Sequence, residues 1–356
     1  MVVMGVFDDI LRSDETLFKN EAALEYAFIP KVIPYREKEQ RHVANCMKPL
    51  LANRNGRNLF IHGPPGIGKT AACRHLLREL EEHDEFSEAA QLFYVNCWQK
   101  NTTYKVVVDL CEQGGYMFTQ NKKTDELLTI LASMVNKKTG IFVFDEVDKA
   151  EDLDFLYTIL EDVFKKSVIL ITNYKSFMLE LDERIKSRMV PELLEFKEYN
   201  EKETEGILKE RIDYAFHPRV FNDDSFKLIG KKAFQLKDIR SGLFLLKESA
   251  LIAEEKSRKK VILEDVKKAI GKLEEFTIKN SAELQEEERK IYNIIKKNSG
   301  KKIGDLHKIY QKEGGKLSYK SFQRKIAKLD EAKFIELTRT HVGGTTTIVN
   351  KKLTDF

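Results

Sequence analysis

The chain has 356 residues, of which 42% are hydrophobic and 33% are charged, and its formal net charge is +4 at pH 7. This length allows two or three domains, and the apolar content suffices for a sizeable core. No apolar run approaches the roughly 18–20 residues that a membrane-spanning helix needs, and the polar residues after the short apolar start argue against a signal peptide. None of the four cysteines forms a Cys-x-x-Cys pair, so their spacing indicates neither zinc nor a redox pair. We expect reduced thiols in an intracellular protein.

The positive charge is concentrated in the last fifth of the chain. Residues 281–356 contain 17 Lys and Arg against 10 Asp and Glu, a balance of +7, whereas the preceding residues contain 44 against 47, a balance of −3. Such an asymmetry indicates a polyanionic partner for the last segment, with an ordinary solvated basic surface as the alternative.

Five short apolar runs predict strands that are buried on both faces. Helical patterns precede and separate them, for example at Arg36–Leu51, Thr70–Glu82 and Leu153–Lys165. Alternating strands and helices indicate an α/β fold with a five-stranded parallel sheet covered on both sides. The predicted strands are Leu59–His62, Leu92–Asn96, Ile141–Asp145, Val168–Thr172 and Leu193–Phe196.

After the last of these strands the pattern becomes helical. Amphipathic segments at 200–216, 222–236, 239–256 and 263–275 predict an all-helical module. The tail then predicts three helices and a hairpin, which together are typical of a winged helix-turn-helix. The predicted tail elements are the helices Glu286–Lys297, Ile303–Glu313 and Ser318–Leu329 and the strands Phe334–Thr338 and Thr346–Asn350. We therefore expect three domains, at residues 1–198, 199–280 and 281–356.

A glycine-rich segment lies between the first predicted strand and the following helix. Its sequence, GPPGIGKT, matches the P-loop pattern G-x-x-x-x-G-K-[ST] in the context that the motif requires. Backbone N–H groups of such a loop point inward at phosphate. We expect Lys69 to reach the β- and γ-phosphates and the Thr70 hydroxyl to ligate Mg²⁺. The predicted nucleotide contacts of this loop are Gly63, Pro64, Pro65, Gly66, Ile67, Gly68, Lys69, Thr70 and Ala71.

Polar residues end two of the later strands. Asp145 and Glu146 follow the apolar run IFVF, at the strand end where open α/β sheets bind ligands. Asp145 is expected to hold Mg²⁺, and Glu146 to act as the general base that polarises the attacking water. Asn173 ends the next strand, where it could orient that water or contact the γ-phosphate; a simple turn-forming Asn is the alternative.

Two arginines precede the last predicted strand. Arg184 and Arg188 lie in the segment ERIKSRM. Either could be an arginine finger that reaches a phosphate on a neighbouring subunit. The alternative is an exposed basic helix end.

The order of these motifs resembles the AAA+ ATPases, and among them the archaeal origin-recognition and cell-division-control initiator family. The segment Ile33–Glu37 (IPYRE) is similar to the family's LPHRE segment. Tyr94–Cys97 with the following Thr103–Val106 resembles its second strand and next helix, and residues 191–200 resemble its passage before the lid. The resemblance runs from Phe18 to the C-terminus.

This resemblance implies further assignments. Asn173 corresponds to sensor 1, and Arg240 to sensor 2, which reaches from the lid to the phosphates. The family usually has glycine where Lys237 stands. Segment 98–123 corresponds to an insertion that contacts the DNA minor groove. The residues expected beside the adenine are Ile33, Pro34, Tyr35 and Arg36.

The third predicted tail helix would enter the major groove of DNA, and the hairpin would form the wing. Phe322, Ile326 and Leu329 recur at helical spacing and should face the core. Arg324 is suited to guanine and Gln323 to adenine, whereas the lysines suit phosphates. The predicted DNA contacts are Lys320, Ser321, Gln323, Arg324, Lys325 and Lys328 on the helix and Arg339, Gly343 and Thr345 in the wing. A protein-interaction module is the alternative.

Together these features predict an ATP-dependent DNA replication initiator that binds duplex origin DNA and helps to load the replicative helicase. ATP, ADP and Mg²⁺ are the expected ligands, slow hydrolysis would act as a switch, and paralogous initiator subunits are further expected partners. We expect a cytoplasmic, chromosome-associated protein. The alternatives are a DNA motor of the branch-migration type and an ATP-gated protein scaffold.

Overall fold

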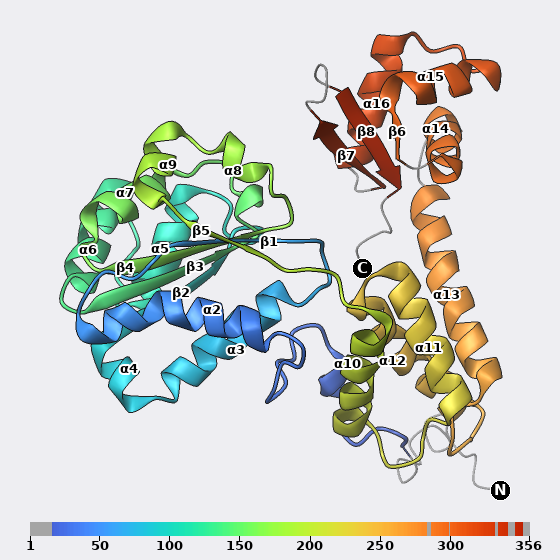
Figure 1. Ribbon diagram of the computed structural model, residues 1–356, viewed down its shortest axis with the longest axis horizontal. Helices are drawn as coiled ribbons and strands as arrows, with labels where there is room; N and C mark the ends of the chain where they lie inside the picture. Colours follow the sequence, from blue (N-terminus) through green and yellow to red (C-terminus); the bar gives the residue numbers. More distant parts are fainter. Residues whose placement is uncertain (1–15, 283–285, 299, 332–333, 341–345, 352–356) are drawn as a thin grey trace, which may run out of the picture. The chain divides into compact units, whose positions relative to one another are not determined.

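The computed structural model describes residues 16–282, 286–298, 300–331, 334–340 and 346–351 (Figure 1). The chain divides into two compact units. The first, here called the sheet unit, comprises residues 20–215 and 237–239. The second, here called the C-terminal unit, comprises the described parts of residues 1–19, 216–236 and 240–356.

The sheet unit is built on a five-stranded parallel sheet, as predicted. The strand order is β2-β3-β4-β1-β5, so β1, which leads into the P-loop, has a neighbour on each side. The strands are β1 (Leu59–His62), β2 (Ala90–Asn96), β3 (Thr139–Asp145), β4 (Lys166–Thr172) and β5 (Glu192–Glu195).

The two faces of this sheet carry separate apolar cores, and β3 shows why its sequence is apolar throughout. Phe142 and Phe144 belong to the core that includes α5, α6 and α7, whereas Ile141 and Val143 belong to the core that includes α2 and α3 (Figure 1). Successive side chains of a strand point to opposite faces, so a strand covered on both sides has no polar alternate positions.

The helices of the sheet unit begin near the predicted positions. Those before and beside the strands are η2 (Glu21–Leu24), α2 (Glu37–Met47), η3 (Lys48–Ala52), α3 (Lys69–Glu81), α4 (Asp84–Ala89), α5 (Thr103–Gln113) and α6 (Thr124–Val135). Those after β3 are η4 (Val147–Lys149), α7 (Asp154–Asp162), α8 (Phe177–Glu180), α9 (Glu183–Met189) and α10 (Glu201–Ala215). The division between the units follows α10, whereas the sequence placed a domain boundary at residue 198.

The C-terminal unit contains the remaining helices and a small antiparallel sheet of order β6-β8-β7. The sequence did not predict β6, which is only two residues long. The predicted turn at Gly343-Gly344 lies outside the described residues. The elements are α11 (Asp223–Leu236), α12 (Ile239–Glu255), α13 (Leu263–Ala282), α14 (Glu286–Lys297), β6 (Lys301–Lys302), α15 (Ile303–Lys312), α16 (Tyr319–Glu331), β7 (Ile335–Thr340) and β8 (Thr346–Lys351).

None of the helices in the described part of the chain combines the length and the apolar character needed to cross a bilayer.

Candidate nucleotide site

The P-loop follows β1 and leads into α3 through backbone positions that suit only glycine. A Cβ atom on Gly63 would overlap the carbonyl oxygen of Phe196, so the loop passes against the chain that leaves β5. Gly68, which caps α3, has φ 84°, a left-handed conformation that side chains disfavour. No side chain caps the start of α3, and the first N–H groups of a helix bind anions well.

Lys69 is folded into this loop. Its Nζ atom donates hydrogen bonds to the carbonyl oxygens of Gly63 and Pro64, both at 2.7 Å, and to Asn173 Oδ1 at 2.8 Å. The residue is only 7% exposed. The structure therefore brings together two predicted site residues, Lys69 at the start of α3 and Asn173 directly after β4.

Thr70 and Asp145 meet directly across the sheet edge. The Thr70 hydroxyl donates to Asp145 Oδ2 at 2.6 Å, and the carboxylate of Asp145 is buried. The Tyr94 hydroxyl donates to the same oxygen at 2.8 Å, while the backbone N–H of Glu146 donates to Oδ1 at 2.9 Å. Asp145 is thus oriented by three donors of the protein itself.

Tyr94 is a positioning residue that the motifs did not reveal. It lies on β2, which pairs with β3 two residues before Asp145. Burial, and then the charge of Asp145, raise the pKa of the Tyr94 hydroxyl well above its ordinary value. Tyr94 therefore stays protonated and remains a donor at any pH at which the protein functions. Its only sequence signal was membership of the family-like YVNC segment.

The chain turns sharply after Asp145. Glu146 has φ 52° and ψ 41°, a left-handed conformation that costs a non-glycine residue on the order of 1–2 kcal/mol. Such strain is concentrated at functional sites. Asp148, two residues later, accepts a hydrogen bond from Thr172 Oγ1 at 2.8 Å and so joins the ends of β3 and β4.

In the structure, Arg36 of the segment predicted to lie beside the adenine connects the P-loop to the chain after β5. Arg36 is 4% exposed. Its Nη2 donates to the carbonyl oxygens of Ile67 at 3.1 Å and Lys197 at 2.6 Å, and its guanidinium carbon lies 4.0 Å from the ring centroid of Tyr199. Arg36 therefore clamps the P-loop to the segment after β5. Ile33 is buried in the core with α3, whereas Tyr35 is 41% exposed.

Replacing Arg36 with lysine should loosen this clamp, because an ammonium group cannot form the planar fork of the guanidinium. Loss of charged hydrogen bonds worth about 1.5–3 kcal/mol each predicts destabilisation by roughly 2–4 kcal/mol. Denaturant unfolding would measure the change, with Arg41→Lys, an exposed position on the same helix, as the control. A free energy of unfolding equal to that of the Arg41→Lys variant would contradict the clamp.

The two candidate finger arginines differ in their surroundings. Arg188 pairs with Glu161, and its guanidinium carbon lies 4.7 Å from the ring centroid of Tyr157. The side chain of Arg184 is 72% exposed; it pairs with Asp182 at the surface, and its guanidinium carbon lies 5.6 Å from the centroid of the same Tyr157 ring. Arg184 is the more accessible of the two.

Residues 237–239 belong to the sheet unit although they lie between α11 and the rest of α12. Lys237 has φ 56°, which explains why glycine would suit this position, and its ammonium group pairs with Glu198 at 2.7 Å. The carboxylate of Asp238 packs so closely on Gly66 that a Cβ atom there would overlap it. Arg240 belongs to the C-terminal unit, so its assignment as sensor 2 stays a prediction.

Helix α16 in the C-terminal unit has one buried and one exposed face. Phe322, Ile326 and Leu329 are at most 1% exposed, which confirms the predicted core positions. Lys320, Gln323, Arg324 and Lys328 are exposed, while Ser321 and Lys325 are half-buried. Arg339 lies in β7 opposite Thr347. Gly343 and Thr345 fall outside the described residues.

Two of the predicted DNA-contacting lysines share an internal partner. The Nζ atoms of Lys325 and Lys328 lie 2.8 and 2.9 Å from Glu288 Oε1, and the Glu288 side chain is 3% exposed. A buried carboxylate needs such partners. These lysines therefore offer phosphate less net charge than the sequence suggested.

The sheet and the nucleotide site together define a class of protein. A family model described as an AAA domain matches residues 52–177, and one described as a Cdc6 AAA+ ATPase-type lid domain matches residues 205–271. The chain is therefore an AAA+ ATPase, a nucleotide-binding protein, with a helical lid.

Curated relatives narrow the class to one family. ORC1-type DNA replication protein 1 of Archaeoglobus fulgidus is 30% identical over 92% of this chain and 84% of the relative. ORC1-type DNA replication protein 2 of Methanosarcina mazei is 29% identical over 97% of this chain and 96% of the relative. The chain belongs to the family of ORC1-type DNA replication proteins. The structure of the Aeropyrum pernix ORC1 protein in complex with DNA covers 94% of both chains, with a TM-score of 0.68 and 24% identity, and shows a similar fold.

Proposed function

We propose that this protein is an ATP-dependent initiator that binds duplex DNA at a replication origin and helps to load the replicative helicase. Its relatives are named DNA replication proteins, and the Aeropyrum pernix ORC1 protein was solved with DNA. The observation that carries the proposal is a P-loop site whose residues hold one another by hydrogen bonds, in one chain with a basic α16. Slow hydrolysis would act as a switch between states that engage and release DNA.

The residues around Asp145 fit a magnesium ion. Thr70 Oγ1 and Asp145 Oδ2 lie 2.6 Å apart, and hydroxyl and carboxylate oxygens are the hard ligands that Mg²⁺ prefers. Mg²⁺ would neutralise charge on the phosphates of the bound nucleotide. Tyr94 and the N–H of Glu146 would keep the carboxylate in place.

Lys69 couples the phosphates to Asn173. An ammonium group has three N–H donors, and in the structure they face Gly63 O, Pro64 O and Asn173 Oδ1. To bind a phosphate oxygen, Lys69 has to give up or share at least one of these partners. Because the carbonyls belong to the loop itself, Asn173 is the partner most easily released, and it would then be available to orient water.

The order of α14, α15, α16 and the small sheet supports a winged helix at the end of the C-terminal unit. Its α16 would lie in the major groove, with Arg324 and Gln323 toward base edges and Lys320 toward phosphate. Within the described part of the chain, Lys320 and Arg324 form no ion pair that would compete with DNA. The basic balance of this segment, +7, supports the same partner.

The test compares duplex binding by the full chain and by a Lys320→Ala/Arg324→Ala variant at several salt concentrations. Loss of two contacts should lower affinity for an origin-derived duplex about tenfold or more, and should reduce the slope of log affinity against log salt by about 1–2. Lys308→Ala, at a 75% exposed position on α15, is the matched control. Wild-type protein that binds origin-derived and random duplexes equally at physiological salt would overturn the proposal. Brisk DNA-stimulated hydrolysis by a ring would instead indicate a motor.

A further inference from the structure

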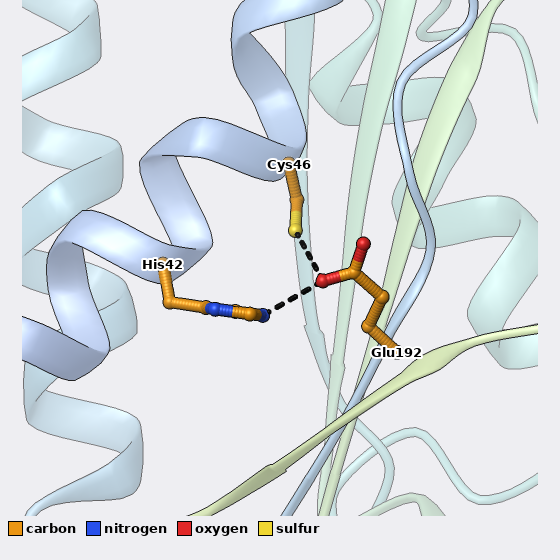
Figure 2. A group of neighbouring side chains, drawn as sticks. All are labelled: His42, Cys46 and Glu192. Atoms are coloured by element: carbon orange, nitrogen blue, oxygen red, sulfur yellow. Dashed lines mark hydrogen bonds and ion pairs between the residues drawn. The ribbon is translucent and has the colours of Figure 1, made fainter.

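Three potential metal ligands meet where α2 packs on the edge strand β5 (Figure 2). His42 and Cys46 are one helical turn apart on α2, so they lie on the same face. Glu192 is the first residue of β5. Its Oε2 atom lies 2.9 Å from His42 Nε2 and 3.8 Å from Cys46 Sγ, and the three ligand atoms all lie within 4.8 Å of one another.

The backbone holds these residues in place. The carbonyl oxygen of Cys46 accepts a hydrogen bond from Arg57 N at 2.9 Å, and Glu192 N donates to Asn58 O at 2.9 Å. The Arg57 guanidinium binds Glu192 Oε1 at 2.5 Å. This ion pair occupies one carboxylate oxygen and leaves Oε2 facing His42 and Cys46 (Figure 2).

The imidazole nitrogen at the centre of the group has no hydrogen bond. His42 Nε2 is shielded from solvent, and within the described part of the chain it has no hydrogen-bond partner. It lies 2.9 Å from Glu192 Oε2, a contact that is an ion pair only if the imidazole is protonated and that does not count as a hydrogen bond. A shielded polar nitrogen without a partner is costly, and a metal ion would satisfy it.

We propose that His42, Cys46 and Glu192 bind one zinc ion, with water in the fourth position. Tetrahedral zinc, at about 2.3 Å from sulfur and about 2.0–2.2 Å from nitrogen and oxygen, sets its ligand atoms about 3.3–3.6 Å apart. The two distances to Glu192, 2.9 and 3.8 Å, lie on either side of this range, and the His42 and Cys46 ligand atoms lie within 4.8 Å of each other, so the three side chains have to rotate to close around the ion. Thiolate and imidazole favour Zn²⁺ over Mg²⁺ or Ca²⁺.

Binding exchanges a proton for the metal. The Cys46 thiol carries a proton that it donates to Glu192. Coordination breaks the S–H bond, forms an S–Zn bond and releases the proton to the buffer. The thiolate and the Glu192 carboxylate then balance the two charges of the ion, while Arg57 holds the other carboxylate oxygen.

This site is distinct from the magnesium site. Glu192 pairs with Leu59 at the beginning of β1, whereas the P-loop follows the end of β1 at His62. The two elements that supply the ligands continue toward the P-loop: Arg36 directly precedes α2, and Lys197 follows β5 by two residues. The Arg36 clamp joins the start of α2 to the chain that follows the end of β5. Zinc would join α2, through His42 and Cys46, to the first residue of β5, and this second connection would stabilise the sheet unit.

Cobalt is a suitable probe, because a thiolate bound to Co²⁺ gives a charge-transfer absorption in the near ultraviolet that oxygen ligands do not give. The full-length, reduced protein should show this band at one equivalent of Co²⁺ and lose it on addition of Zn²⁺. Cys46→Ser should abolish the band, and His42→Gln and Glu192→Gln should each weaken metal binding at least about tenfold.

Two control variants separate this site from others. Cys111→Ser removes another buried thiol, and Asp145→Asn alters the proposed magnesium site; both should keep the band. Zinc should also raise the unfolding temperature of the wild type but not of Cys46→Ser, which circular dichroism would show to be folded. No thiolate band in the wild type, or an undiminished band in Cys46→Ser, would overturn the proposal.

Discussion

Replacing Lys69 with alanine is expected to lower ATP affinity at least about 100-fold. The variant loses the charged hydrogen bonds to phosphate, worth about 1.5–3 kcal/mol each, and every 1.4 kcal/mol is about tenfold in affinity. It also loses the contacts that tie Gly63, Pro64 and Asn173 together, so the loop should be less ordered before binding. Titration with a fluorescent ATP analogue would measure the change.

The control for this experiment is Lys175→Ala, which removes an exposed lysine just after Asn173. Its affinity should stay within about threefold of the wild type, because a surface charge contributes little. ATP binding by Lys69→Ala as tight as that of the control would refute the P-loop assignment. Since the two variants remove the same charge, net electrostatics alone cannot account for a difference between them.

The sequence predicted the strands of the sheet and the P-loop because each is identified by a short, continuous stretch of residues. Continuous apolar runs such as IFVF identify strands covered on both faces, and the spacing of GPPGIGKT identifies the loop between β1 and α3. Asp145 and Asn173 come from the ends of β3 and β4, and Lys69 and Thr70 begin the helix that follows β1 through the P-loop, so the order of the strands brings them together at one edge of the sheet.

Contacts between residues distant in sequence could not be predicted in this way. Tyr94 contacts Asp145 because β2 and β3 pair in a particular register. The sequence of either strand alone does not determine that register. The ion pairs of Lys325 and Lys328 depend on Glu288, which lies on another helix and offsets one of their two charges. Cysteine spacing gave no sign of the His42, Cys46 and Glu192 group, because its third ligand is 146 residues beyond the thiol.

Arg36 shows how a motif can be recognised while some contacts of its residues stay hidden in the sequence. The segment IPYRE was expected beside the adenine. In the structure the buried guanidinium donates to Ile67 O and Lys197 O, and the place of this segment beside the adenine stays a prediction. An arginine buried with paired donors acts on the P-loop through its carbonyl groups. Arg36 would therefore affect nucleotide binding indirectly, by fixing the conformation of the P-loop.

The Glu146→Gln variant should bind ATP normally and lose hydrolysis. Glutamine has nearly the same shape, and the hydrogen bond from the backbone N–H of residue 146 to Asp145 Oδ1 does not depend on the side chain. The left-handed turn at this position can also be kept. An amide cannot accept the proton of the attacking water, and loss of a general base typically costs about 10²–10⁴-fold in rate.

Single-turnover hydrolysis, with bound ATP and ADP separated by chromatography, would measure this loss directly even if wild-type turnover is slow. Glu151→Gln changes an exposed acid that follows η4 and should hydrolyse at the wild-type rate. Unaltered hydrolysis by Glu146→Gln would show that another group is the base. If hydrolysis acts as the switch, the ATP-loaded Glu146→Gln protein should remain on origin-derived duplex for as long as the nucleotide stays bound, whereas the wild type should leave as ADP accumulates.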